Sequence, residues 1–315
     1  MNAIGYTKTL QVVSGIAAAL AIAACNLNPI APEATAVPSP VEKEAVLSTI
    51  ESRPTATPAP EATTILARPG CRLVWNDEFD EDGFPNPAKW FYDQAPNNWN
   101  LGTLHYYTNL RKENARVEDG RLIIEARREQ MKDRDYTAAR LQSRKEWTYG
   151  RFEISAKLPS DGRGIVSALW MRGNPRTYGS WPASGEIDIM EHVGHWPDAI
   201  HGTIHTEAYN HRIGTQKKET TKLPTARTQL NLYALEWTPS AIRIFVNDTH
   251  YFTFENETLS DPAADYRQWP FDNSHHIILS MAVGGGWVGN HNVDPSYFPQ
   301  QLEIDFVRVF ECSYQ

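Results

Sequence analysis

Short runs of alternating apolar and polar residues dominate the chain beyond residue 68. From Phe152 to Leu158 every second side chain is apolar and those between are polar, which predicts a strand with one buried face. Asn247-Asp248 is a hairpin-turn signal between two further runs. No long stretch repeats at the helical period, so the pattern predicts one all-β domain, a sandwich or jelly roll. Strands are expected at Arg121–Arg127, Tyr149–Leu158, Ala241–Val246, Tyr251–Phe254, His276–Val283 and Leu302–Phe310.

The first 24 residues have the pattern of a targeting segment. Lys8 precedes an apolar run from Leu10 to Ala24 that is too short and too alanine-rich for a transmembrane helix. The run ends in Ile22-Ala23-Ala24-Cys25, which resembles the lipobox of bacterial lipoproteins. The resemblance implies cleavage before Cys25 and a lipid on its sulfur, hence an extracytoplasmic protein anchored to a membrane or cell surface. An ordinary secretion signal with an incidental cysteine is the alternative.

Residues 25–67 read as a linker that follows the anchor cysteine. They contain seven prolines, many Ala and Thr, and no aromatic residue. Such a composition cannot bury enough apolar surface to offset its ordering entropy, so we expect a disordered, extended segment. The globular domain is therefore expected to cover residues 68–315, in which two cysteines, Cys71 and Cys312, lie near the two ends. Export would permit a disulfide between them, and two unpaired buried thiols are the alternative.

The net charge of −8 argues against nucleic acid or an anionic lipid surface as a binding partner. It is compatible with a neutral polysaccharide. We expect a monomer that touches a membrane only through its lipid.

Three carboxylates stand within six residues of a strand-like segment. Glu186 and Asp188 share one face by the two-residue period of a strand, whereas Glu191 should face the other way. One extra residue, a β-bulge near Met190, would bring Glu191 back beside the other two. Crowded acids repel, so one of them should hold a proton near neutral pH, as cleavage of a glycosidic bond requires. A half-buried strand with a solvated face and a calcium site are the alternatives.

Tryptophans flank these acids in the sequence, and aromatic faces can stack on sugar rings. Trp170, Trp181, Trp196 and Trp287 flank them, and of these Trp170, Trp181 and Trp287 are the candidates for sugar contact, with burial in the core as the competing interpretation for each. In the segment that follows the acids, His201, Thr203 and His205 share a face. If that strand is antiparallel to the acid strand, His205 could meet Asp188 or Glu191. A zinc site at His201 and His205 is not expected, because no third ligand stands nearby.

The segment Trp181–Gly194, WPASGEIDIMEHVG, resembles the active-site signature of glycoside hydrolase family 16, in its laminarinase (endo-β-1,3-glucanase) branch. The likeness continues through LVWNDEFD from Leu73, YGRFEISAKLP from Tyr149, ALWM from Ala168, HGTIHTEAYNH from His201, YALEWTP from Tyr233 and IDFVRVF from Ile304. It implies a jelly roll of two curved antiparallel sheets with a substrate cleft on the concave face. It also implies that Glu186 is the nucleophile of a retaining hydrolase, Asp188 its electrostatic aide and Glu191 the acid/base. No cofactor is expected for catalysis.

The resemblance extends to binding residues and, in one segment, departs from the family. The substrate-binding candidates are Asn100, Trp170, Trp181, His205 and Trp287. Members of the branch commonly carry Glu and Gln where this chain has Thr103 and His105, so a subsite here is expected to accept a different sugar or linkage. A structural calcium on the convex face is implied at Glu78, the Gly120 carbonyl and Asp305, with a water-filled surface site as the alternative.

The sequence therefore predicts an endo-β-glucanase that cuts β-1,3 or mixed β-1,3/1,4 linkages. A family relative that acts on a galactan of the agar or carrageenan type is one alternative, and a transglycosylase is another. A non-catalytic glucan-binding surface lipoprotein is the alternative from outside the enzymes.

Overall fold

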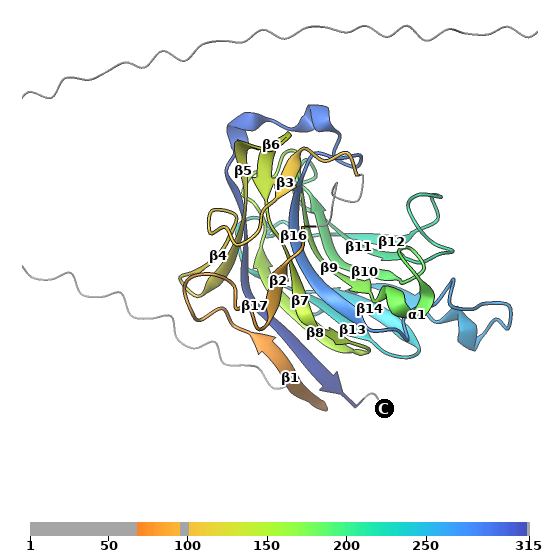
Figure 1. Cartoon of the computed structure of the whole chain (residues 1–315). Helices are drawn as coiled ribbons and strands as arrows, with labels where there is room; N and C mark the ends of the chain where they lie inside the picture. The colour runs from red at the N-terminus through yellow and green to blue at the C-terminus, as the bar shows by residue number, and fades with distance from the viewer. Residues whose placement is uncertain (1–67, 95–100, 314–315) are drawn as a thin grey trace, which may run out of the picture. The chain divides into compact units, whose positions relative to one another are not determined.

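The structure is a computed structural model that describes residues 68–94 and 101–313 (Figure 1). Two sheets pack face to face, and all their strand pairs are antiparallel except β3 with β6. This confirms the predicted sandwich of two antiparallel sheets. The ten-stranded sheet contains β1 (Cys71–Asp77), β3 (His105–Tyr107), β4 (Ala115–Glu118), β5 (Arg121–Met131), β6 (Arg134–Ala138), β8 (Gly150–Lys157), β13 (Asn231–Trp237), β14 (Ala241–Val246), β15 (Thr249–Glu255) and β17 (Gln300–Cys312).

The second sheet has seven strands in the order β12-β11-β10-β9-β16-β7-β2. They are β2 (Trp90–Tyr92), β7 (Arg140–Trp147), β9 (Ile165–Gly173), β10 (Glu186–Val193), β11 (Ala199–His205), β12 (Lys217–Lys222) and β16 (His275–Val283). Helical structure among the described residues is limited to α1 (Pro175–Tyr178) and three single 3-10 turns, η2 (Glu257–Leu259), η3 (Asn290–Asn292) and η4 (Pro295–Tyr297).

The hydrophobic core lies between the sheets, and strand β9 shows how the sequence divides its two faces. Leu169 and Met171 are fully buried in the core. Trp170 and Arg172, one position on in each case, line a pocket on the opposite face. Successive side chains of a strand point to opposite faces, so β9 serves the core and the pocket at once.

Most predicted strands agree with the structure to within a few residues. Strand β14 covers the range predicted for it, and β5 and β17 extend beyond theirs. Asn247 and Asp248 have φ of 47° and 61°, the left-handed backbone of a tight hairpin turn.

The polar face of β8 shows what the alternation did not reveal. Arg151 and Glu153 are buried there, because β8 lies between β13 and β17. Arg151 donates to Glu153 at 2.6 Å and to Glu236 on β13 at 2.8 Å, so this face is a buried ion-pair network.

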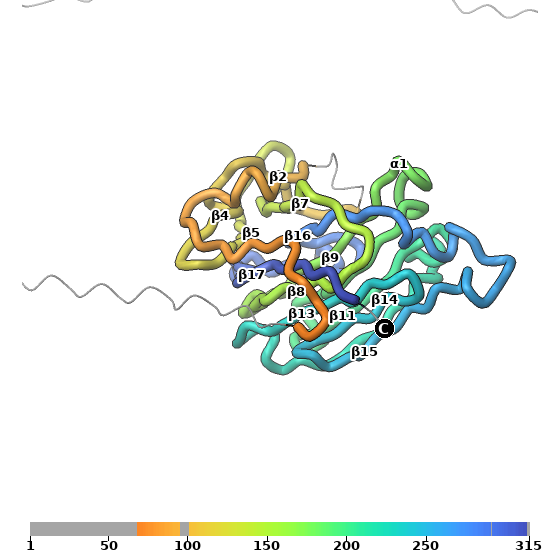
Figure 2. Tube along the Cα trace, turned by 90° about the horizontal axis from the view of Figure 1, so that it is seen from below, coloured from red at the N-terminus to blue at the C-terminus, as the bar shows by residue number. Residues whose placement is uncertain are grey.

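A disulfide closes the domain. Cys71 and Cys312 are partners in the pairing of β1 with β17, and their sulfurs are bonded at 2.02 Å. The two strands lie side by side in both overall views (Figures 1 and 2). The pairing expected from the sequence is therefore the one present in the structure.

Several expectations fall on residues that the structure does not describe. The signal peptide over residues 1–24, the linker over residues 25–67, Cys25 and Asn100 lie outside the described residues. Within the described part of the chain, no helix has the length and apolar character needed to cross a membrane.

Candidate active site

A glycine fixes the entry of the chain into the acid strand. Gly185 has φ of 82°, a backbone conformation that side-chain-bearing residues rarely adopt. A Cβ atom at this position would also lie 2.9 Å from Pro270 and 3.0 Å from Phe271. Gly185 therefore allows the chain to turn tightly against Pro270 and Phe271 and to begin β10 at Glu186.

The predicted bulge is present in β10. Asp188 pairs with Trp170 of β9, but Met190 pairs with Leu169, so Ile189 is the extra residue. Ile189 and Met190 are both fully buried in the core. Because of the bulge, Glu191 recovers the orientation of the earlier acids, and Glu186, Asp188 and Glu191 all line one pocket.

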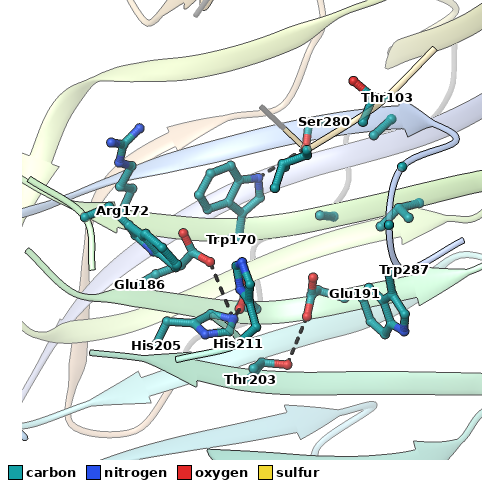
Figure 3. Close-up of a pocket in the computed structure, with 18 of the residues that line it drawn as sticks. Thr103, Trp170, Arg172, Glu186, Glu191, Thr203, His205, His211, Ser280 and Trp287 are labelled. Atoms are coloured by element: carbon teal, nitrogen blue, oxygen red, sulfur yellow. Dashed lines mark hydrogen bonds and ion pairs between the residues drawn. The ribbon is translucent and has the colours of Figure 1, made fainter. Parts of the chain in front are cut away.

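The pocket lies on the face of the seven-stranded sheet that is turned away from the core, and has a volume of about 640 Å³ (Figure 3). Strands β9, β10, β11 and β16 supply its floor. The loop from Gly284 to Trp287, the segment from His211 to Gln216 and Lys218 of β12 contribute to its walls. An open pocket with three acids and aromatic walls suits an extended polar substrate.

Glu186, Asp188 and His205 form a compact group. His205 is the register partner of Glu186 across the antiparallel β10–β11 pair. Its Nε2 lies 3.7 Å from Oε1 of Glu186 and 3.4 Å from Oδ2 of Asp188. Burial lowers the pKa of His205 to about 3, so the imidazole is neutral at working pH and these contacts are not ion pairs. These three are the one set of acids and histidines among the described residues close enough to hold a metal ion.

The predicted partners of His205 are partly right. His205 lies against Asp188, as expected, and against Glu186. Thr203, two residues earlier on the same face of β11, contacts the third acid: its hydroxyl donates to Oε2 of Glu191 at 2.9 Å (Figure 3). The sequence grouped Thr203 with the histidines but assigned it no role.

Burial raises the pKa of all three acids. Burial and repulsion by Glu191 raise the pKa of Glu186 to about 8. The Arg172 guanidinium and the Trp181 indole partly offset this rise, because both stabilise the carboxylate. The pKa of Asp188 rises well above its usual value through burial and repulsion by both glutamates. The pKa of Glu191 rises to about 7 through burial, opposed by Thr203 and Lys218. The group therefore retains protons near neutral pH, as the crowding of the acids predicted.

Two tryptophans lie toward the two ends of the row of acids, each with a cation over its ring. The Arg212 guanidinium lies 4.5 Å from the ring centre of Trp181, whose indole interacts with Glu186. The Lys218 ammonium lies 5.6 Å from the ring centre of Trp287, next to Glu191 (Figure 3). Both tryptophans line the pocket, so both are placed to contact a sugar.

Trp170 has a different position. Only 7% of it is exposed, and its Nε1 lies 3.2 Å from the Ser280 hydroxyl on β16. It is therefore largely buried, as the core interpretation predicted, and it also lines the floor of the pocket, where a substrate could contact it.

The sequence missed the cations of the pocket. Arg172 is the register partner of Glu186 on β9, and its charge favours the ionised form of Glu186. Arg140, Arg212 and Lys218 also line the pocket. The position of Arg172 in the pocket was predictable, because it lies two residues after Trp170 on the same face of the strand. The positions of the other three cations depend on which distant segments become neighbours in the fold.

The segment that departs from the family lies in the same pocket. Thr103 lines it and forms a bridge with Gly284. His105 also lines it, but is fully buried and accepts the backbone N–H of Val283 at Nδ1 at 2.9 Å. His105 therefore fixes β3 to the end of β16, a structural role that the sequence did not predict.

The calcium ligands expected on the convex face do not fit a cation well. Both carboxylate oxygens of Glu78 accept from the Arg308 guanidinium, at 2.9 and 2.7 Å. This ion pair lowers the pKa of Glu78 against the effect of its burial. A carboxylate already neutralised by arginine is a poor calcium ligand, which would leave only Asp305 and the Gly120 carbonyl.

Comparisons with known proteins identify the family of the chain. The family model described as "Glycosyl hydrolases family 16" matches residues 103–308. The chain is 56% identical over 246 residues to the beta-glucanase of Rhodothermus marinus, which covers 77% of this chain and 86% of the relative. The X-ray structure of the laminarinase from Rhodothermus marinus has a TM-score of 0.75 at 55% identity and covers 78% of this chain and 98% of that one.

A further similar structure contains a glucan oligosaccharide. It is a mutant of SCLam, described as a non-specific endo-beta-1,3(4)-glucanase of this family, with a 1,3-beta-D-cellobiosyl-glucose at its active site. The TM-score is 0.72 at 40% identity, over 78% of this chain and 97% of that one. A family model that matches most of the described domain, together with relatives of this identity and coverage, shows that the chain belongs to the glycosyl hydrolases of family 16.

Proposed function

We propose that this protein is a retaining endo-β-1,3-glucanase that also accepts mixed β-1,3/1,4-glucan. The bulged strand β10 carries the proposal, because it directs three carboxyl groups with raised pKa into one pocket. The similar proteins support the substrate class, since they are named as a beta-glucanase, a laminarinase and an endo-beta-1,3(4)-glucanase.

In the first step Glu186 is the nucleophile. Its carboxylate attacks the anomeric carbon while the Glu191 carboxyl gives its proton to the glycosidic oxygen, so the C–O bond breaks and a glycosyl ester forms. Arg172 opposite Glu186 favours the ionised nucleophile. Asp188, whose pKa burial raises well above its usual value, stays protonated and adds no second negative charge beside Glu186.

In the second step Glu191 acts as the base. It takes a proton from water, the water oxygen attacks the anomeric carbon, and the Glu186 carboxylate leaves. Two inversions give net retention, and Glu191 regains its proton. The Thr203 hydroxyl supports this step because it donates to the ionised form of Glu191.

The alternatives from the sequence are not needed. A galactan-specific relative and a non-catalytic glucan-binding protein are disfavoured by the glucanase names of the relatives at 40–56% identity and by the complete set of acids in the pocket. A transglycosylase would share the first step and differ only in whether water or a sugar accepts the glycosyl group.

A panel of polysaccharides tests the proposal directly. The purified enzyme should shorten β-1,3-glucan and mixed β-1,3/1,4-glucan to oligosaccharides and leave agar and carrageenan intact. Product NMR taken within the first minutes should show the β-anomer. Cleavage of galactan alone, or an initial α-anomer, would contradict the proposal.

For the cell, we propose an extracytoplasmic enzyme held by a lipid on Cys25, with residues 26–67 between the anchor and the catalytic domain. The lipobox-like run that ends at Cys25 supports this location. We further propose that the enzyme acts as a monomer, because one chain supplies every group of the pocket described above.

A further inference from the structure

Four aromatic rings in successive contact, here called a row, lie near the acid Glu191. His201 is the register partner of Glu191 in the β10–β11 pair. Its ring lies 5.3 Å from that of Trp287 and 6.1 Å from that of Trp196. The ring of His195 lies 4.5 Å from Trp196 and ends the row.

The row leads out of the pocket. Trp287 lines the pocket, whereas Trp196 lies beyond its lining, in the turn between β10 and β11. Two backbone hydrogen bonds fix that turn: the N–H of Trp196 donates to Val193, and the N–H of Ala199 donates to Trp196. His201 is buried, and its Nδ1 lies 2.7 Å from the Thr220 hydroxyl, so the ring between the two tryptophans is held in place.

Trp196 leaves much of its ring uncovered. It is 46% exposed, more than Trp287 at 38%, although water contact at an indole is unfavourable. An exposed aromatic ring in continuity with a substrate pocket marks a place where a ligand can cover it.

We propose that Trp196 is a distal sugar-binding platform, on which a glucosyl unit of the chain held in the cleft stacks beyond the unit at Trp287. This inference rests on the proposed function and adds a subsite to it. A β-glucosyl ring suits the platform because all its hydroxyls are equatorial and both faces present C–H groups. A galactosyl ring has an axial hydroxyl that interrupts one face.

Kinetics on long and short substrates test the platform. For Trp196→Ala we expect KM on long β-1,3-glucan to rise about three- to tenfold, which corresponds to the loss of one aromatic contact, with little change in kcat. A β-1,3-linked disaccharide places one unit on each side of the bond that is cut and does not extend past Trp287, so its kcat/KM should not change. Trp196→Phe should restore most of the affinity for the long chain. Phe84→Ala, which removes an exposed ring next to Gly83, the residue that bridges Val117 of β4, is the matched control and should leave both substrates unaffected.

A binding measurement separates this inference from the proposed function. In the Glu186→Gln background, calorimetry should show weaker binding of long glucan when Trp196 is also replaced by Ala. Equal KM and equal binding with and without the Trp196 ring would overturn the platform while leaving the glucanase assignment intact. Failure of the wild-type enzyme to cut any β-1,3-glucan would instead contradict the proposed function.

Discussion

The Thr203 hydroxyl donates a 2.9 Å hydrogen bond to Oε2 of Glu191 across the β10–β11 pair. A hydrogen bond to a carboxylate stabilises its ionised form, so Thr203 lowers the pKa of Glu191 against the larger effect of burial, which raises it. The balance leaves the pKa of Glu191 at about 7. A group that must give a proton in one step and take one in the next works best with a pKa near the operating pH.

Removal of this hydrogen bond should shift the pH profile. Without the donor, the pKa of Glu191 rises, so Thr203→Val should move the alkaline limb of kcat/KM on glucan to higher pH. Thr203→Ser keeps the hydroxyl and should retain the wild-type limb. Profiles measured from pH 4 to pH 9 distinguish the two variants. An alkaline limb that stays in place in Thr203→Val would show that Glu191 does not control it.

Substitution of the acids should separate their roles. Glu186→Gln should abolish turnover of glucan while leaving its binding nearly intact, because the nucleophile is lost and the shape is kept. Glu191→Ala should regain part of its activity with azide on substrates whose leaving group needs no proton. Asp188→Asn should be slower but active. Near-normal hydrolysis of unactivated polysaccharide by Glu186→Gln would contradict the assignment of the nucleophile.

The raised pKa of Glu186 also makes stability depend on pH. The folded chain shares protons among Glu186, Asp188 and Glu191 well above the pH at which an unfolded glutamate loses its proton, near pH 4.5, so folding stability falls as pH rises above that value. Glu186→Gln should therefore be more stable than wild type at pH 8 and differ little from it at pH 4.5. Urea unfolding at the two pH values measures the difference. A gain that is the same at both would mean that protonation of Glu186 is not its source.

Glu129 provides a control of opposite sign. The Arg111 hydrogen bond lowers its pKa to about 2, so its contribution to stability is present at neutral pH and is lost as pH falls through that value. Glu129→Gln should therefore be less stable than wild type at pH 7, and the deficit should shrink toward pH 2.

The bulge in β10 was predictable because two requirements conflicted within one short segment. The proposed chemistry requires the three acids on one face of the strand. Glu191 is five residues after Glu186, so in a regular strand it would face the other way, and one extra residue is needed to bring it to the same face. The strand alternation and the hairpin at Asn247 were local signals of the same kind, and the structure agrees with both.

What the sequence could not provide is the neighbourhood created by register between distant strands. Thr203 meets Glu191, and Arg172 lies opposite Glu186, because β11 and β9 pair with β10 at particular offsets. Lys218 reaches Trp287 from β12 for the same reason. Short-range patterns contain no information on these offsets, which are set by packing of the whole sheet.

The disulfide should stabilise the domain without affecting the chemistry. Cys71 and Cys312 are separated by 241 residues, for which the chain-entropy model gives about 5 kcal/mol at most. Replacing both with Ser should lower the melting temperature by several degrees and leave kcat/KM unchanged well below it, because the bridge lies at β1 and β17 and not in the pocket. Two free thiols in the unfolded, unreduced protein would exclude the bridge.

The last prediction concerns Cys25. A single lipid chain gives only marginal membrane residence, so stable anchoring needs the several chains that lipoprotein processing adds. Cys25→Ser should therefore move active enzyme from the membrane fraction to the soluble fraction, with unchanged kinetics on soluble glucan. Cell fractionation shows where the enzyme lies, and mass spectrometry of the mature N-terminus shows whether the processed chain begins at Cys25. If wild-type enzyme is found free in the medium and cleaved beyond Cys25, the segment is an ordinary secretion signal and the anchor does not exist.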